Sequence, residues 1–129
     1  MLLRLCSRNH VQPAIQRVVD RMDRQGFAEK DVFAMRLALE EALVNSLIHG
    51  NKSDPTKTVE VRCTVNCTEV EVQVQDQGQG FDPDAVPDPL APENLERPCG
   101  RGLLLMRHYM TSVKYNDVGN CVTLVKEKG

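Results

Sequence analysis

The sequence predicts a single domain of the α+β class, in which helices pack against a sheet. Its 129 residues are enough for one buried core and for one domain of ordinary size. Residues 57–66 and 68–76 alternate apolar and polar side chains, as adjacent antiparallel strands do when one face of their sheet is buried. Residues 11–25 and 29–49 instead repeat apolar side chains at helical spacing. Both patterns occur in one chain without an internal repeat, which indicates an α+β domain over residues 1–129.

The composition narrows the classes of function. The net charge is −2 with 26% charged residues, and no basic run points to nucleic acid. No apolar stretch is long enough to span a bilayer, and residues 1–6 are too short for a signal peptide. The five cysteines are an odd number, and Cys63-x-x-x-Cys67 has no partner pair at the spacing of a zinc site. We therefore expect a reduced, cytoplasmic protein that contacts neither nucleic acid nor membrane directly.

The N-terminal part predicts a short strand at residues 2–7 and a helix at residues 11–25. Four apolar residues share one face of this helix: Ile15, Val18, Val19 and Met22. Gly26 closes the helix, and a second helix at residues 29–49 ends before Gly50.

A polar stripe runs along the second helix, although most of its circumference is apolar and therefore typical of a buried helix. Glu41, Asn45 and His49 fall at positions i, i+4 and i+8, while Glu40 points about 100° away. A carboxylate and a carboxamide one turn apart suit a general base and a metal-ligand oxygen; a solvated edge is the alternative. Three small residues interleave with the stripe, and they either leave room for a ligand or permit close helix packing: Ala34, Ala38 and Ala42.

The predicted strand at residues 68–76 ends in an acid followed by two glycines, Asp76-Gln-Gly78-Gln-Gly80. Asp76 has the same parity as the three valines of the strand, which should face the core, so its carboxylate should point inward. A buried carboxylate needs hydrogen-bond donors, and an exocyclic amine such as that of adenine is one. The alternative is a strand end at which the glycines merely turn the chain.

A long loop over residues 77–99 follows and contains five of the seven prolines. A loop of this length in a compact domain often acts as a binding loop or lid, with a disordered insertion as the alternative. The glycine pairs at or near its two ends favour a movable flap.

A second glycine cluster, Gly100-Arg101-Gly102, lies at the start of a predicted helix at residues 101–111, immediately before its apolar run Leu103-Leu-Leu-Met106. A glycine-rich turn that opens a helix presents N–H groups and the positive end of the helix dipole to a phosphate. Arg97 and Arg101 would add positive charge there. Two further strands are expected at residues 112–117 and 120–127, around the turn at Gly119.

These motifs, in this order, resemble those of the GHKL (Bergerat-fold) ATP-binding superfamily: helix Glu-x-x-x-Asn, strand-end Asp-x-Gly-x-Gly, a variable lid, and Gly-x-Gly before a helix. The segments LALEEALVNSLIHGN and ERPCGRGLLLMRHYMTSVKY look most like those of the anti-sigma factor serine/threonine kinases. The likeness runs along essentially the whole chain. It implies a two-layer α+β sandwich with a mixed, mostly antiparallel sheet, helices on one face and a nucleotide lid at about residues 81–99.

The resemblance also implies roles for individual residues. Glu41 would be the general base that activates the attacking hydroxyl, and Asn45 a ligand of Mg²⁺. Asp76 would accept a hydrogen bond from the adenine amine of ATP, with glycines that let the backbone approach the nucleotide. The implied nucleotide-binding set consists of Asn45, His49, Asp76, Gly78, Gly80, Arg97, Gly100, Arg101, Gly102, Leu103 and Asn120.

One position departs from the family pattern. The last hairpin of the family often reads Gly-Thr-x-Val, with a threonine that assists the adenine-binding acid. Here the hairpin reads Gly119-Asn120-Cys121-Val122. Asn120 can still form hydrogen bonds, but its side chain differs from threonine in length.

The implied activity is transfer of the γ-phosphate of ATP to a serine or threonine of an anti-sigma factor antagonist with a STAS-type domain. A sigma factor would be the second partner, and the family often forms homodimers. Two alternatives remain: a nucleotide-dependent binding module without phosphotransfer, and the catalytic domain of a two-component histidine kinase. The latter would need a helical dimerisation segment with a phospho-accepting histidine, which this sequence does not show.

Overall fold

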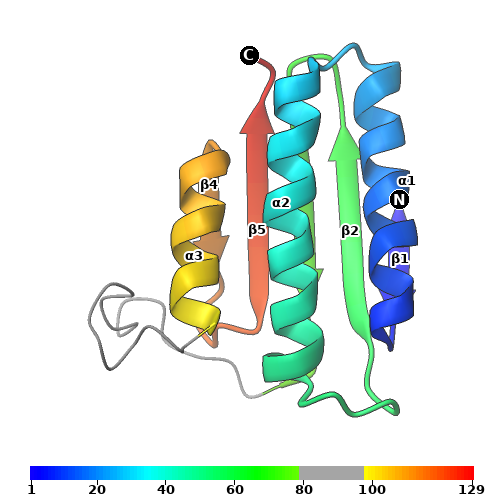
Figure 1. The fold of residues 1–129 in the computed structure, drawn as a ribbon, viewed down its shortest axis with the longest axis vertical. Coiled ribbons are helices and arrows are strands. Elements are labelled where there is room, and N and C mark those ends of the chain that lie inside the picture. The colour runs from blue at the N-terminus through cyan, green and yellow to red at the C-terminus, as the bar shows by residue number, and fades with distance from the viewer. Residues whose placement is uncertain (79–97) are drawn as a thin grey trace.

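The computed structural model describes residues 1–78 and 98–129 as an antiparallel sheet covered on one face by three helices (Figure 1). The sheet has five strands in the order β1-β2-β3-β5-β4, and all four pairings between neighbours are antiparallel. The strands are β1 Leu2–Leu5, β2 Val59–Val65, β3 Glu69–Gln75, β4 Ser112–Tyr115 and β5 Cys121–Glu127. The predicted two-layer α+β class is therefore confirmed. The expectation of a mixed sheet is corrected, because every pairing among the described strands is antiparallel.

The helical layer consists of α1 Val11–Arg24, α2 Glu29–Asn45 and α3 Pro98–Tyr109. In Figure 1, α2 lies in the middle of this layer, between α1 and α3. Two short helical turns complete the described elements, η1 Arg8–His10 and η2 Ser46–Gly50. No helix among the described residues has the length and apolar character needed to cross a membrane.

The core forms where the inward side chains of the sheet meet the helices. The alternation predicted for these two strands is observed, because Val59, Val61 and Cys63 of β2 are buried, while Arg62 and Thr64, which point to the other face, are exposed. In β3 the buried side chains are Val70, Val72 and Val74. The opposite face of the sheet carries the polar side chains of the same strands, and none of the described helices lies over it (Figure 1).

The alanines of α2 take part in this core rather than leaving space for a ligand. Ala34, Ala38 and Ala42 are all buried in the main hydrophobic cluster. Because α2 has a helix on each side and the sheet beneath it, small side chains let its neighbours approach closely. Of the two interpretations of these alanines, close packing is the correct one.

The beginning of α3 also differs from the prediction. The helix begins at Pro98 rather than near residue 101, so Pro98 and Cys99 of the expected lid form its first turn. Proline suits this position, because its φ angle is already helical and its missing N–H would have no partner there. The remaining lid residues, 81–97, lie outside the described part of the chain.

Candidate functional site

The acid at the end of β3 points into the protein, as its parity predicted. Asp76 is 9% exposed and follows three buried valines of the same strand. Its carboxylate accepts a hydrogen bond from the Gly78 N–H at 2.7 Å and another from the Ser46 hydroxyl. Its own backbone N–H donates to the Asn120 carbonyl at 2.9 Å. The carboxylate is therefore held by the turn that follows β3 and by the end of α2.

Burial raises the pKa of Asp76 above its ordinary value of 3.8, because the charged form loses hydration. The Gly78 amide, the Ser46 hydroxyl and the Lys57 charge each lower this pKa and offset part of the effect. A carboxylate in this position gains from any additional donor that reaches it, and an exocyclic amine is a suitable one.

Two glycines are packed directly against this carboxylate. A Cβ at Gly50 would overlap the carboxylate of Asp76, and a Cβ at Gly78 would overlap the carbonyl group of Gly50. Space, rather than an unusual φ angle, requires glycine at these two positions. The sequence analysis identified Gly78 but treated Gly50 only as the end of a helix, a place where glycine is common.

The contact with Gly50 depends on a π-helical turn at the end of α2. Residues Ser46–Gly50 form η2, in which the Asn51 N–H donates to the Ser46 carbonyl at 2.8 Å, five residues earlier. The sequence predicted one regular helix over residues 29–49, and the wider last turn is a departure from it. Such turns are frequent at functional sites because they redirect side chains and backbone at a helix end. Here two residues of the turn, Ser46 and Gly50, contact Asp76.

The polar stripe on α2 has the geometry that its spacing predicted. Burial raises the pKa of Glu41, and the neighbouring Glu40 raises it further, while a hydrogen bond from the Asn45 side chain and the charge of His49 lower it. Glu41 and Asn45 are half-buried, and Glu40 and His49 are exposed. The Asn45 side chain lowers this pKa as a hydrogen-bond donor does, so its amide nitrogen faces Glu41, while its side-chain oxygen is of a type that can bind a metal ion.

Asn120 contacts the turn after β3. Its amide nitrogen donates to the Gly78 carbonyl at 3.4 Å, and its side-chain oxygen accepts from the Asn116 amide at 2.7 Å. The hydroxyl that reaches the Asp76 carboxylate comes instead from Ser46. Ser46 is buried and was missed in the sequence analysis, because a serine within an apolar helix carries no signal of a partner far along the chain.

The phosphate part of the expected site is described only in its backbone. Gly100, Arg101 and Gly102 lie within α3 rather than before it, since that helix begins at Pro98. Leu103 is buried in the core, next to this segment. Two further expected residues, Gly80 and Arg97, lie outside the described residues.

Metal binding at this place would depend on few protein ligands. Among residues 1–78 and 98–129, no group of three or more His, Cys, Asp or Glu side chains could hold a metal ion. Mg²⁺ in nucleotide sites is commonly held by one or two protein oxygens together with phosphates and water. The carbonyl oxygen of Asn45 fits that chemistry. All four cysteines whose side chains are described carry free thiols.

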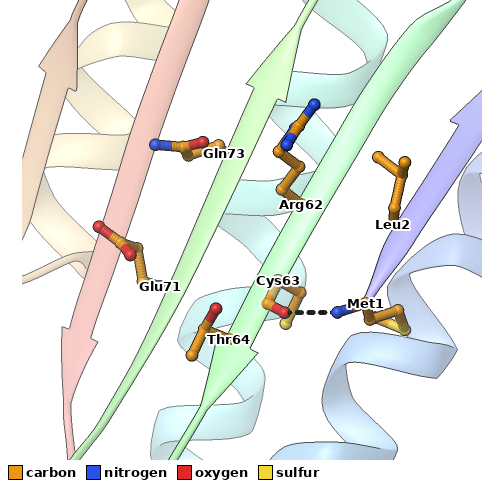
Figure 2. A pocket seen from close by; sticks show the side chains of 7 residues that line it. All are labelled: Met1, Leu2, Arg62, Cys63, Thr64, Glu71 and Gln73. Carbon is orange, nitrogen blue, oxygen red and sulfur yellow. Dashed lines mark hydrogen bonds between the residues drawn. The ribbon is translucent and has the colours of Figure 1, made fainter.

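A separate hollow of about 370 Å³ lies on the other face of the sheet (Figure 2). It is lined by Met1, Leu2, Arg62, Cys63, Thr64, Glu71 and Gln73. Arg62, Thr64, Glu71 and Gln73 come from positions of β2 and β3 that alternate with buried ones. None of the expected site residues that the structure describes lines it, so this hollow is distinct from the site around Asp76.

This chain is similar to a known protein family and to several individual proteins. The family model described as "Histidine kinase-like ATPase domain" matches residues 7–126. The anti-sigma F factor of Oceanobacillus iheyensis is 32% identical over 83 residues, which are 62% of this chain and 56% of that protein.

Two serine-protein kinases RsbW are also similar to this chain. The protein from Bacillus licheniformis is 32% identical over 110 residues, 80% of this chain and 69% of the relative. That from Listeria monocytogenes serotype 4a is 31% identical over 110 residues, 80% of this chain and 70% of the relative. The chain thus spans between about half and 70% of the length of these relatives.

Proposed function

This chain belongs to the histidine kinase-like ATPase domain family, and from that premise we propose that it is an ATP-dependent serine/threonine protein kinase that acts as an anti-sigma factor. Its acceptor would be a serine or threonine of an anti-sigma factor antagonist with a STAS-type domain. It would also sequester a sigma factor and thereby regulate transcription from the cytoplasm, acting as a homodimer. Support comes from the names of its relatives, an anti-sigma factor and serine-protein kinases, which agree with the motifs of the sequence.

One observation carries the proposal: a buried acid and two glycines lie together at the end of a helix that carries a polar stripe. Asp76, at 9% exposure, would accept a hydrogen bond from the adenine amine of ATP. The close packing of Gly50 and Gly78 around its carboxylate leaves backbone, rather than side chains, next to the base. Along the adjoining helix, Glu41 and Asn45 lie within hydrogen-bond reach of each other.

The chemistry proposed for the helix stripe is positioning and proton acceptance. Burial raises the pKa of Glu41, which makes its carboxylate a better acceptor for the proton of the attacking hydroxyl. Asn45 orients the Glu41 carboxylate through its amide and would bind Mg²⁺ through its carbonyl oxygen. When bound, Mg²⁺ supplies positive charge that neutralises the phosphates. The amides near Gly100 and Gly102 and the guanidinium groups of Arg97 and Arg101 would contact those phosphates, and residues 81–99 would form the lid.

The test compares nucleotide binding with phosphate transfer. We expect saturable calorimetric binding of Mg-ADP and Mg-ATP to the wild-type protein, and incorporation of label from γ-labelled ATP into a purified candidate antagonist. Glu41→Ala should lower transfer by at least about a hundredfold, the effect typical of losing a general base, while its Mg-ADP affinity stays within about threefold of wild type. Glu40→Ala is the matched control, because the exposed Glu40 lies outside the stripe.

The outcomes separate the alternatives. Equal loss of binding and transfer in Glu41→Ala would contradict its role as general base. Nucleotide-dependent binding of a partner without any label transfer would favour a regulatory binding module. Failure of the folded wild-type protein to bind either nucleotide would overturn the proposed function.

A further inference from the structure

We propose that a closed ring of three hydrogen bonds, formed by Asn51, Thr58 and Gln77, positions the base-binding turn of this protein; the inference rests on the function proposed above. The Gln77 N–H donates to the Asn51 side-chain oxygen at 2.7 Å. The Asn51 amide donates to the Thr58 carbonyl at 3.0 Å. The Thr58 N–H closes the ring by donating to the Gln77 side-chain oxygen at 2.8 Å.

The ring joins three segments that are distant in sequence. Asn51 follows the π-helical turn at the end of α2, Thr58 immediately precedes β2, and Gln77 lies between Asp76 and Gly78. Asn51 is only 1% exposed, and its backbone N–H donates to the Ser46 carbonyl at 2.8 Å. A buried amide that lost its ring partners could not replace them readily with water, so the ring holds these segments in one arrangement.

The turn needs this support because it lies beyond the last residue of β3. On the β5 side, the turn is held by Asn120, which accepts from the Asp76 N–H and donates to the Gly78 carbonyl. The ring holds the same turn from the β2 side. Asp76 and Gly78 are thus held on the β5 side through their own backbone groups. On the β2 side they are held through Gln77, which lies between them.

The tolerance for movement at this place is small. Gly50 lies against both the Asp76 carboxylate and Gly78, with no room for an additional carbon atom. Asn51 is the next residue, so the ring fixes the backbone immediately after this contact. For a carboxylate to recognise a base, its position must be held within about 0.5 Å and its direction within about 10–20°. Asn51 and Gln77 are therefore positioning residues, which act on the nucleotide through Asp76.

The test uses paired substitutions at Gln77, an exposed residue whose replacement leaves the core intact. Gln77→Met removes the side-chain acceptor of the Thr58 N–H at similar size, and we expect it to weaken Mg-ADP binding about three- to tenfold in calorimetry, as for loss of one hydrogen bond. Gln77→Glu keeps an acceptor oxygen and should bind within about twofold of wild type. Asn51→Ala removes two bonds of the ring and should weaken binding more than Gln77→Met does.

Asn66→Ala is the matched control. The Asn66 side chain also closes a turn, accepting from the Thr68 N–H at 2.8 Å and the Glu69 N–H at 2.9 Å, but at the opposite end of β2 and β3. We expect this variant to lose stability and to keep wild-type Mg-ADP affinity when both are measured well below the unfolding midpoint. In the transfer assay, the Gln77→Met variant should raise KM for ATP while kcat stays within about twofold, since Glu41 and Asn45 are untouched.

A failure of this inference can be distinguished from a failure of the proposed function. Wild-type affinity in both Gln77→Met and Asn51→Ala, with normal binding by the parent protein, would overturn the ring and leave the proposed function standing. Equal weakening by Asn66→Ala would reduce the effect to general stability and overturn the inference. If Asn51→Ala does not fold, the contrast between Gln77→Met and Gln77→Glu decides alone. A wild-type protein that does not bind Mg-ADP would overturn the proposed function and this inference with it.

Discussion

The Asp76 carboxylate shows at the scale of one residue how stability and proposed function oppose each other. Its burial makes the charged form costly, and the amide and hydroxyl that reach it offset only part of that cost. A protein selected for stability alone would do better with a neutral group at this position. A ligand that supplies a further hydrogen-bond donor would offset the cost of burying this charge. Binding sites often keep groups that destabilise the ligand-free protein.

We therefore expect Asp76→Asn to stabilise the ligand-free protein at pH 7, while weakening Mg-ADP binding at least tenfold. The pKa of Asp76 is raised in the folded state, so the wild type is less stable above that pKa than below it. As the pH falls through that raised pKa toward the ordinary value of 3.8, Asp76 takes up its proton and the advantage of the variant shrinks. Urea unfolding of both proteins at several pH values measures this difference.

Asp54→Asn provides a control of opposite sign. Hydrogen bonds from the Thr56 side chain and backbone lower the pKa of Asp54, so its charge stabilises the folded state and this contribution is lost on acidification. Asp54→Asn should consequently destabilise the protein at pH 7, with a difference that also shrinks toward low pH. A stabilising effect in both variants, or in neither, would contradict the role of burial at Asp76.

Some site residues could be predicted because they follow simple periods. The stripe of Glu41, Asn45 and His49 follows from the helical repeat, and the inward direction of Asp76 follows from strand parity. Ser46 and Asn51 could not be found in this way, because their partners lie 30 and 26 residues further along the chain. Such pairings depend on how separate elements dock, which no local pattern records.

At the scale of elements, the end of α2 determines the shape of the candidate site. The sequence predicts a regular helix through residue 49, and the π-helical turn at Ser46–Gly50 replaces its last turn. All three helices and all five strands that the structure describes were predicted, with ends that differ by no more than four residues from those observed, whereas the short turn η1 was not predicted. Their ends are less predictable because caps, prolines and tertiary contacts decide them, as Pro98 does for α3.

Gly50→Ala tests the tight contact between this helix end and the turn after β3. The added methyl group would overlap the Asp76 carboxylate, so either the helix end or the turn must move. We expect a loss of about 1–3 kcal/mol in the free energy of unfolding and at least a tenfold loss of Mg-ADP affinity. Thermal unfolding followed by calorimetric titration measures both.

Gly26→Ala separates strain from the effect on the site. Gly26 has a φ angle of 78°, so alanine there is strained, but it lies in the connection between α1 and α2. This variant should lose about 1 kcal/mol of stability and retain wild-type nucleotide affinity. If Gly50→Ala behaved like Gly26→Ala, the contact between Gly50 and Asp76 would have no part in binding.

At the scale of the whole molecule, the contacts between α2 and the segment after β5 lie at one end of this helix, and the candidate site lies at the other end. The C-terminal end of α2 carries Glu41 and Asn45, whereas the first turn carries Asp31, next to the C-terminus of the chain (Figure 1). Asp31 is 1% exposed and accepts a hydrogen bond from the Gly129 N–H at 3.1 Å. The Lys126 ammonium lies 3.9 Å from its other oxygen. This carboxylate therefore ties the segment after β5 to the helical layer.

Asp31→Ala should lower the free energy of unfolding by about 2 kcal/mol, because it removes a buried charged acceptor and leaves the Gly129 N–H and the Lys126 ammonium without it. Asp31→Asn keeps an acceptor for the Gly129 N–H and should cost less. Because α2 is a continuous helix anchored by the core along its length, neither variant should change the affinity for Mg-ADP or the rate of phosphate transfer below the unfolding transition. Urea unfolding and calorimetry on the same samples test this separation. Loss of nucleotide binding in folded Asp31→Ala would instead show that the two ends of α2 are coupled, and the site would then depend on the whole helical layer rather than on its local contacts.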